Sequence, residues 1–210
     1  MKIELIDAAG GDLSVVNSAR VSFNKEATEI GDNDARLIRY LAKHRHDTPF
    51  RHNFVQLRCC VPVFLARQLM KHQAGLTWNE ESRRYIDYLP DFYIPEGWRM
   101  RPEDGIKQGS GKHHPFSPRW TREYEDYLTE AKNLYTDMLS DGIAPEMARM
   151  VLPQSMMVNF IWSGNLLAFY HVWNLRSGDG AQVEAREFAK ILRDAIEPAF
   201  PISWKALEER

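Results

Sequence analysis

The sequence of 210 residues has few features that would commit it to a membrane, to secretion or to a polyanion. No run approaches the roughly 20 apolar residues that a membrane helix needs, and the opening "MKIELIDAAGGD" lacks the apolar core of a signal peptide. The formal net charge is -2, so only a local cluster of cations could form an anion site. We therefore expect a soluble, cytoplasmic protein that binds neither membranes nor nucleic acid.

Cysteine is scarce. The two cysteines, Cys59 and Cys60, are adjacent in the chain. Neighbouring side chains on an extended strand point to opposite faces, so a disulfide between them is not expected and a reducing compartment is indicated. Both lie in an apolar stretch without a neighbouring base, which favours a place in the core over a role as nucleophile.

The usual signatures of nucleotide loops and metal sites are also missing. The chain has no G-x-G-x-x-G and no Walker loop, which argues against a Rossmann or P-loop site. His44, His46 and His52 lie close together, but without H-E-x-x-H, paired cysteines or a carboxylate triad. We predict no metal, and a nucleotide hydrolase with a metal on these histidines remains as a rival.

What is present is the pattern of a helix-rich mixed α and β protein, and we expect residues 1–210 to form one domain. The hydrophobic share of 44% and the charged share of 27% are typical of a globular chain. Apolar periodicity predicts strands over 2–7, 53–62 and 155–164. It predicts helices over 32–44, 63–72, 120–142, 144–153, 165–176 and 179–200. Residues 101–119, rich in Gly, Pro and charge, are predicted to form a mobile loop or a variable insertion.

The most unusual stretch is "RQLMKHQAGLTWNEESRRYIDY", residues 67–88, which gathers cations and amides. It is predicted to begin on a helix, with Gln68 and His72 on one face, and to continue as a loop. Arginine offers a planar fork of donors that suits a phosphate or a carbonyl-rich ring. A phosphate beside a polar heterocycle would satisfy this set. A surface network with the nearby carboxylates is the alternative, and the residue types alone do not decide between them.

Two further arginines stand in apolar surroundings far along the chain. Arg149 lies in "EMARMVLP", and Arg176 ends "HVWNLR". Because an unpaired buried charge is costly, each is a candidate for a binding site or a paired interior position. The alternative for each is an arginine whose charged end reaches water or interacts with the end of a helix.

Five segments, in order, resemble motifs of the flavin-dependent thymidylate synthases. The stretch "RQLMKHQ…NEESRRY" resembles the family signature of Arg-Gln, Arg-His-Arg, seven residues, and a Ser followed by Arg-Tyr. "ARVSF", "HDTPFRH", "EMARMVLP" and "NLRSGDGAQVE" resemble its other motifs, so the resemblance covers about residues 19–190. Residues 71–73 read Lys-His-Gln instead of Arg-His-Arg, eight residues precede Ser82, and Gly180 stands where the family often has a histidine.

The resemblance implies an α+β fold with helices around a central mixed or antiparallel sheet. It implies reductive methylation of dUMP to dTMP, with methylenetetrahydrofolate as carbon donor and NADPH-reduced FAD as hydride source, and without an enzyme nucleophile. It also implies a homotetramer whose active sites are shared between subunits. One alternative is a catalytically impaired relative that binds the nucleotide and the flavin. Another is a protein that binds single-stranded nucleic acid through the cations of residues 67–84.

The same resemblance implies a role for each residue that matches a motif. Arg176 would be the catalytic residue, because a cation beside the uracil carbonyl favours the negative charge that develops during addition to the ring. Arg149 would come from a neighbouring subunit. The residues expected to bind dUMP are Gln68, Glu80, Ser82, Arg83, Arg84, Arg149 and Arg176. The residues expected to bind FAD are Ser22, His46, Thr48, Lys71, His72, Gln73, Glu80, Asn165 and His171.

Overall fold

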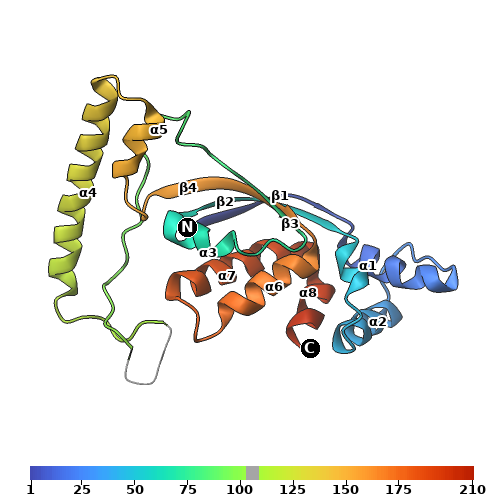
Figure 1. Cartoon of the computed structure of the whole chain (residues 1–210). Helices are drawn as coiled ribbons and strands as arrows, with labels where there is room; N and C mark the ends of the chain where they lie inside the picture. The colour runs from blue at the N-terminus through green and yellow to red at the C-terminus, as the bar shows by residue number, and fades with distance from the viewer. Residues whose placement is uncertain (103–108) are drawn as a thin grey trace.

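A four-stranded antiparallel sheet forms the centre of the computed structural model, which describes residues 1–102 and 109–210 (Figure 1). The strand order is β1-β2-β4-β3, so β2 and β4 lie in the middle of the sheet. The strands are β1 (Lys2–Ala9), β2 (Phe54–Pro62), β3 (Leu76–Glu80) and β4 (Met157–Gly164). The expected α+β class is confirmed, and the sheet is antiparallel throughout.

Alternation along the central strands gives the sheet one buried face and one polar face. In β2, Leu57, Cys59 and Val61 are fully buried, whereas Arg58 between them is exposed. Helices α6 (Leu166–Ser177) and α7 (Val183–Ile196) lie on the buried side (Figure 1). Trp162 of β4 packs there against two phenylalanines, one from each helix. The core therefore lies between the sheet and these helices.

The remaining helices surround this core. Helices α1 and α2 stand at one end of the sheet, and α4 and α5 stand at the other (Figure 1). The α-helices other than α6 and α7 are α1 (Gly11–Arg20), α2 (Asp32–Lys43), α3 (Val63–Leu69), α4 (Ser117–Ser140), α5 (Pro145–Ala148) and α8 (Pro201–Glu208). Four short 3-10 turns are described: η1 (Val21–Phe23), η2 (Thr48–Arg51), η3 (Arg149–Val151) and η4 (Glu197–Ala199). Among the described residues, no helix combines the length and apolarity needed to span a bilayer.

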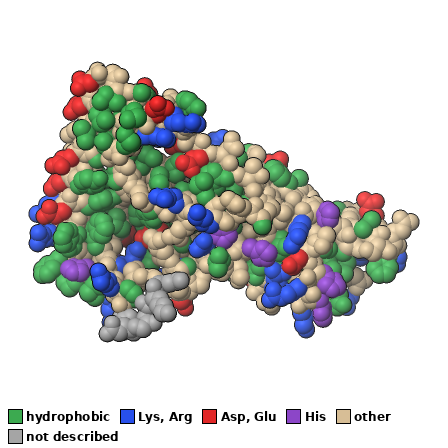
Figure 2. Space-filling model, viewed as in Figure 1, with side chains coloured by type: hydrophobic (Ala, Val, Ile, Leu, Met, Phe, Trp, Pro, Cys, Tyr) green, Lys and Arg blue, Asp and Glu red, His purple; other side chains and the backbone are tan. Residues whose placement is uncertain are grey.

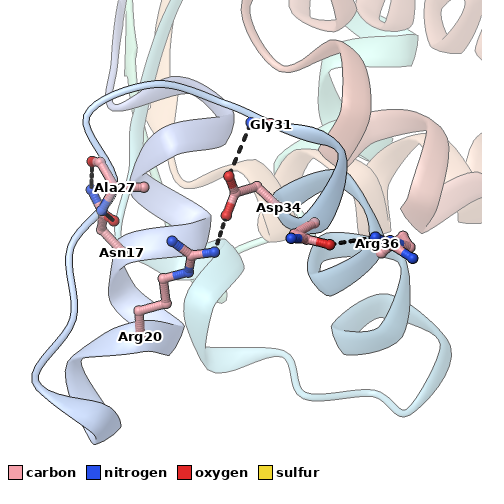
Figure 3. A network of polar contacts seen from close by, with 7 residues as sticks. Asn17, Arg20, Ala27, Gly31, Asp34 and Arg36 are labelled. Atoms are coloured by element: carbon pink, nitrogen blue, oxygen red, sulfur yellow. Dashed lines mark hydrogen bonds and ion pairs between the residues drawn. The ribbon is translucent and has the colours of Figure 1, made fainter.

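A polar network fixes the loop between α1 and α2 (Figure 3). Arg20 forms an ion pair with the buried carboxylate of Asp34. That carboxylate also accepts from the Gly31 amide at 2.9 Å and thereby satisfies a free donor at the start of α2. Asn17 exchanges two hydrogen bonds with the backbone of Ala27, at 2.9 and 2.8 Å. The arginine of the "ARVSF" motif is therefore committed to holding the fold.

Residues 117–151, which we call the outlying arm, pack on the extended segment before α4. Tyr124 donates its hydroxyl to the Tyr93 carbonyl at 3.2 Å, and Tyr135 donates to the Ile86 carbonyl at 3.4 Å. The arm carries a broad group of apolar side chains on its surface (Figure 2). Its large exposed apolar residues are Trp120, Tyr127, Leu134, Ile143, Met147 and Met150. An exposed apolar surface of this kind is typical of a contact with another protein surface.

The structure differs from the sequence prediction in several elements. Residues 67–88 are predicted to pass from a helix into a loop, but Leu76–Glu80 form β3, whose Trp78 ring stacks on Phe160 at 3.5 Å. The helices α1 and α8 carry no prediction. The loop or insertion predicted at 101–119 is tested only in part: its residues 103–108 lie outside the described residues, and α4 begins at Ser117.

Candidate active site

Arg176, in the last turn of α6, meets the end of α3. Its Nε donates to His72 Nε2 at 3.1 Å, and its Nη2 donates to the Gln68 carbonyl oxygen at 3.4 Å. The two elements meet because α3 follows β2 directly and α6 follows β4 after a single residue, Asn165. The structure thus joins the polar stretch to an arginine 104 residues further along the chain. We call Gln68, His72 and Arg176 the arginine cluster.

Burial and charge define the protonation of the cluster. Burial, together with the charges of Arg176 and His171, lowers the pKa of His72. Its Nε2 accepts the hydrogen bond from Arg176, so the neutral ring carries its proton on Nδ1. Burial also lowers the pKa of Arg176, but a guanidinium remains charged in proteins. The cluster therefore presents a fixed positive charge beside a neutral imidazole.

Gln182, just before α7, extends the cluster on its other side. Gln68 Nε2 donates to Gln182 Oε1 at 2.7 Å. Gln182 lines a cavity of about 350 Å³ together with Arg99 and Glu184. Gln182 is not among the predicted site residues although it lies in the motif "NLRSGDGAQVE", because residue type and spacing do not show what its amide contacts. Only the approach of α3 to α7 does so.

A second, cationic group surrounds His171 on α6. Arg210 Nη1 lies 2.6 Å from Asp47 Oδ1, and its Nη2 lies 3.4 Å from His171 Nε2. Burial lowers the pKa of His171, as do the charges of Arg210, Arg51 and Arg45, while Asp47 opposes them. The charge of His171 acts in the same direction on the pKa of His72, after burial and Arg176.

A small cavity of about 190 Å³ lies beside His171. It is lined by Arg51, Ala74, Gly75, Asn165, Leu167, Ala168 and His171. Gly75 has φ of 75°, and a Cβ there would lie 2.7 Å from Asn165 Nδ2, so a side chain would not fit. Asn165 Oδ1 accepts from the Ala168 amide at 2.9 Å and caps α6. Small residues and a capped helix start thus leave a wall that a flat ligand could approach closely.

The other residues expected to bind FAD are more scattered. Lys71 and Gln73 are exposed beside His72, at the end of α3. His46 and Thr48 are exposed on the segment that precedes β2. Ser22 is exposed in η1, beyond α1 and away from α6 (Figure 1). The structure brings Asn165 and His171 together but shows no contact between these residues and Ser22.

The "SRRY" segment forms a turn after β3, in which the Tyr85 amide donates to the Ser82 carbonyl at 3.0 Å. The two arginines therefore diverge instead of alternating along a strand. Arg84 is exposed, and its Nε donates to Ser82 Oγ at 3.2 Å. Arg83 is only 5% exposed; its guanidinium donates to the Tyr88 carbonyl and lies 4.6 Å from the centre of the Tyr88 ring.

Glu80 closes β3 next to this turn. Burial raises the pKa of its carboxyl, and the charge of Glu81 acts in the same direction. A hydrogen bond from Trp78 Nε1 to Glu80 Oε2, at 3.2 Å, partly opposes this effect. Glu80 thus offers a carboxyl acceptor at the end of β3, with a pKa above its usual value.

Arg149 begins η3 directly after α5, on the outlying arm, and α5 lies apart from α3 and α6 (Figure 1). It is exposed, and its Nε donates to the Glu146 carbonyl at 3.1 Å. The apolar neighbours in "EMARMVLP" therefore do not draw this arginine into the interior of its own chain.

The two cysteines and the histidines His44 and His46 form neither an activated nucleophile nor a metal site among the described residues. Cys59 is buried in the core as expected, and Cys60 is half-buried. Burial raises the pKa of both thiols, which disfavours the thiolate that a nucleophile requires. The rings of His44 and His46 pack around Tyr40 at 4.3 and 6.0 Å. Within residues 1–102 and 109–210, no group of three or more potential ligands is placed to hold a metal ion.

Comparison with known proteins gives consistent matches over nearly the whole chain. Residues 4–202 match the family model described as thymidylate synthase complementing protein. A flavin-dependent thymidylate synthase of Thermus thermophilus is 33% identical over 207 residues, covering 99% of this chain and 75% of that protein. That of Kosmotoga olearia is 33% identical over 207 residues, covering 97% of this chain and 88% of that protein.

Solved structures agree with these matches. The crystal structure of the UMP/dUMP methylase PolB from Streptomyces cacaoi, bound with 5-Br dUMP, has a TM-score of 0.88 and 30% identity. The match covers 99% of this chain and 94% of that chain. The same protein bound with 5-Br UMP has a TM-score of 0.87 and 29% identity, covering 99% and 93%.

Proposed function

Because the chain belongs to the flavin-dependent thymidylate synthase family, we propose that it methylates dUMP reductively to dTMP with FAD as its cofactor. NADPH supplies the electrons, and methylenetetrahydrofolate supplies the carbon. The observation that carries the proposal is the arginine cluster, in which residues of two family motifs meet through hydrogen bonds of 3.1 and 3.4 Å.

The cavity beside His171, of about 190 Å³, is where we propose that one face of the flavin ring lies, with the rest of the cofactor extending beyond it. Gly75 and the capped start of α6 offer a wall that a side chain would block, and Arg51, which lines the cavity, supplies donors suited to a pyrophosphate. Lys71, His72, Gln73, Asn165 and His171 would hold the cofactor here. Ser22, His46, Thr48 and Glu80 are kept as further proposed contacts. FAD, when bound and reduced, supplies the hydride, so the protein needs no nucleophile of its own.

Arg176 acts on the substrate ring in this proposal. Its Nε and one Nη are engaged by His72 and Gln68, which hold the guanidinium plane in place. The remaining N–H groups face the substrate and stabilise negative charge on a uracil carbonyl oxygen as a bond forms at the ring. Neutral His72 accepts from Arg176 without competing for its charge.

The remaining nucleotide contacts point to a site shared between subunits. Ser82, Arg84 and Arg149 offer donors for the phosphate, with Glu80 as a nearby acceptor and Arg83 as a support beneath the turn. Arg149 directly follows α5, which lies apart from α3 and α6 within one chain, and the outlying arm exposes apolar side chains. We therefore propose a homotetramer in which neighbouring chains complete each site and folate binds at the shared opening.

UMP is the second candidate substrate. The relative with a TM-score of 0.87 is described as a UMP/dUMP methylase and was solved with 5-Br UMP. Both nucleotides carry the same uracil ring, so the arginine cluster does not distinguish them. A parallel assay with UMP and dUMP decides which sugar this chain accepts.

The first test is a visible absorption spectrum of the purified protein, saturated with FAD where necessary. NADPH and dUMP are then added without air, followed by methylenetetrahydrofolate. We expect a flavin band that bleaches and a dTMP product. A protein that takes up no flavin even after FAD is added back would contradict the proposal, and the impaired relative would then replace it.

Two broader proposals accompany this function. We propose that residues 1–210 act as one domain, with the variable segment near 101–119, since the family match runs from residue 4 to 202. We also propose a reducing, cytoplasmic setting, which the two free cysteines support.

A further inference from the structure

A row of polar side chains leads away from the arginine cluster. Gln68 Nε2 donates to Gln182 Oε1 at 2.7 Å. Two positions after Gln182, in the first turn of α7, Glu184 accepts at Oε1 from Arg99 Nη2 at 2.5 Å. We call Arg99, Glu184, Gln182 and Gln68 the amide relay. Its first three members line the same cavity of about 350 Å³.

The far end of the relay has a fixed polarity. An arginine side chain has only donors, and an ionised carboxylate has only acceptors. Glu184 is 2% exposed, and burial alone would raise its pKa; hydrogen bonding from Arg99 and Gln182 outweighs burial and lowers it. Glu184 is therefore ionised at neutral pH, and it must face donors.

This polarity settles the orientation of Gln182. Its Oε1 is occupied by Gln68, which leaves its Nε2 as the group available to the carboxylate. Glu184 Oε2 is buried and has no hydrogen-bond partner among the described residues, and Gln182, two positions earlier, lines the same cavity. The free Nε2 of Gln182 is the donor that suits this acceptor. Reversing the amide would place its oxygen against an ionised carboxylate, with no proton between the two acceptors. Glu184 thus holds Gln182 in one of its two orientations.

The orientation of Gln182 in turn fixes the orientation of the Gln68 side-chain amide. Since Gln182 offers an oxygen, Gln68 must offer its Nε2, and its Oε1 is left as an acceptor without a hydrogen bond to any described residue. The backbone of the same residue accepts from Arg176. A ring that carries an N–H next to a C=O would match an acceptor from Gln68 and a donor from Arg176. Uracil has this edge at N3, whereas N3 of cytosine is itself an acceptor.

We propose that Gln182 and Glu184 are positioning residues that fix the Gln68 amide for uracil and against cytosine. The proposal rests on the proposed function, because it takes the ring of the substrate to be read by Gln68. Beyond the proposed function, it explains how uracil is selected over cytosine. The explanation lies in Gln182 and Glu184, which do not touch the nucleotide. A site built to accept an N–H rejects a ring that lacks it, because two acceptors then face each other.

The test compares equilibrium binding of dUMP and dCMP to the full chain saturated with FAD, and of UMP and CMP if the ribonucleotides bind better. Glu184→Gln keeps the shape of the side chain but removes its charge. The Gln182 amide can then turn either its oxygen or its nitrogen toward position 184, because an amide both donates and accepts. Gln182→Met keeps the length and removes the polarity. We expect the uracil-to-cytosine affinity ratio to fall by about tenfold in each variant, the value of one well-formed hydrogen bond.

Gln154→Met is the matched control, because Gln154 is exposed and its side chain lies outside the relay. Its affinity ratio should equal that of the unmodified protein. Thermal unfolding of every variant reports its folding. If Glu184→Gln does not fold, Gln182→Met carries the test, because it leaves the Arg99–Glu184 pair in place.

An unchanged ratio in folded Glu184→Gln and Gln182→Met would overturn the relay, even if the melting temperature fell, because a merely structural pair affects stability and not ring selection. Equal binding of dUMP and dCMP by the unmodified protein would overturn it as well. Failure to bind any uracil nucleotide would overturn the proposed function itself. That result is distinguishable because the unmodified protein is measured first.

Discussion

The arginine cluster and the turn at 82–85 both take residues from the polar stretch, yet the fold treats them differently. In the cluster, His72 and Gln68 hold Arg176 from another helix, and all three are partly buried. In the turn, Arg84 is exposed and bonds within its own segment. The arginine cluster is thus organised within a single chain. The exposed arginine of the turn makes no hydrogen bond or ion pair with a described residue outside its own segment.

Long-range packing explains the contrast. Helices α3 and α6 lie against the same buried face of the sheet, so their ends are held at a fixed separation. The turn follows the edge strand β3, which pairs only with β4. An arginine on such an edge keeps its solvation and its rotamer freedom until a ligand or another subunit restricts it.

The largest expected effect is that of Arg176→Ala. Removing the charge that stabilises the developing oxyanion should lower kcat about 10²- to 10³-fold. FAD should stay bound, because the cavity beside His171 is lined by other residues, and visible absorbance measures this. Arg39→Ala, which removes an exposed arginine on α2, is the control and should be fully active. An Arg176→Ala enzyme of normal kcat would make the cluster purely structural.

Subunit mixing tests whether Arg149 and the arginine cluster meet between chains. Arg149→Ala should raise the KM for dUMP by roughly tenfold or more, since a phosphate contact is lost. Co-expression of Arg149→Ala chains with Arg176→Ala chains should restore activity in about a quarter of the sites, if each site draws on two subunits at random. Mixed tetramers, purified through two different tags, are assayed at low dUMP. Activity no higher than the mean of the separate variants would place both arginines in one chain's site.

Acid should weaken the cluster more than the turn. The pKa values of His72 and His171 are lowered in the folded protein, mainly by burial. The folded state then binds fewer protons than the unfolded state, so these groups contribute stability above a pH of about 6.5 that is lost as pH falls through their folded values. Urea unfolding at pH 7.5 and 5.5 measures the loss. His72→Gln keeps an acceptor for Arg176 without titrating, and should reduce the dependence; an unchanged dependence would contradict this origin.

The smallest effect on turnover is expected for the cysteines. Cys60→Ser and Cys59→Ser should keep kcat within about twofold, because burial raises the pKa of both thiols and disfavours the thiolate that a nucleophile requires. Cys59→Ser should cost stability, roughly 1–3 kcal/mol, since it places a hydroxyl in the core. Loss of turnover in a folded cysteine variant would instead indicate a covalent mechanism.

Several strands and helices can be predicted from the local spacing of apolar residues. The alternation in β1 and β2 and the apolar run of β4 predict strands, and the helical spacing in α2 and α7 predicts helices. The strand β3 is not readable in this way, because "LTWNE" becomes a strand by pairing with β4 and by stacking Trp78 on Phe160. The turn at 82–85 is likewise set by the burial of Arg83 under Tyr88.

The sequence by itself determined which motifs the chain carries, that its cysteines lack an activating base, and that Arg176 and the polar stretch belong to one candidate site. Only the tertiary structure decided that Arg176 contacts His72, that Arg149 follows α5 on the outlying arm, and that Gln68 donates to Gln182. The physical reason is separation along the chain. Residue type and spacing define what a side chain can donate or accept, but Gln68 and Gln182 are 114 residues apart and meet only once the sheet and its helices have packed.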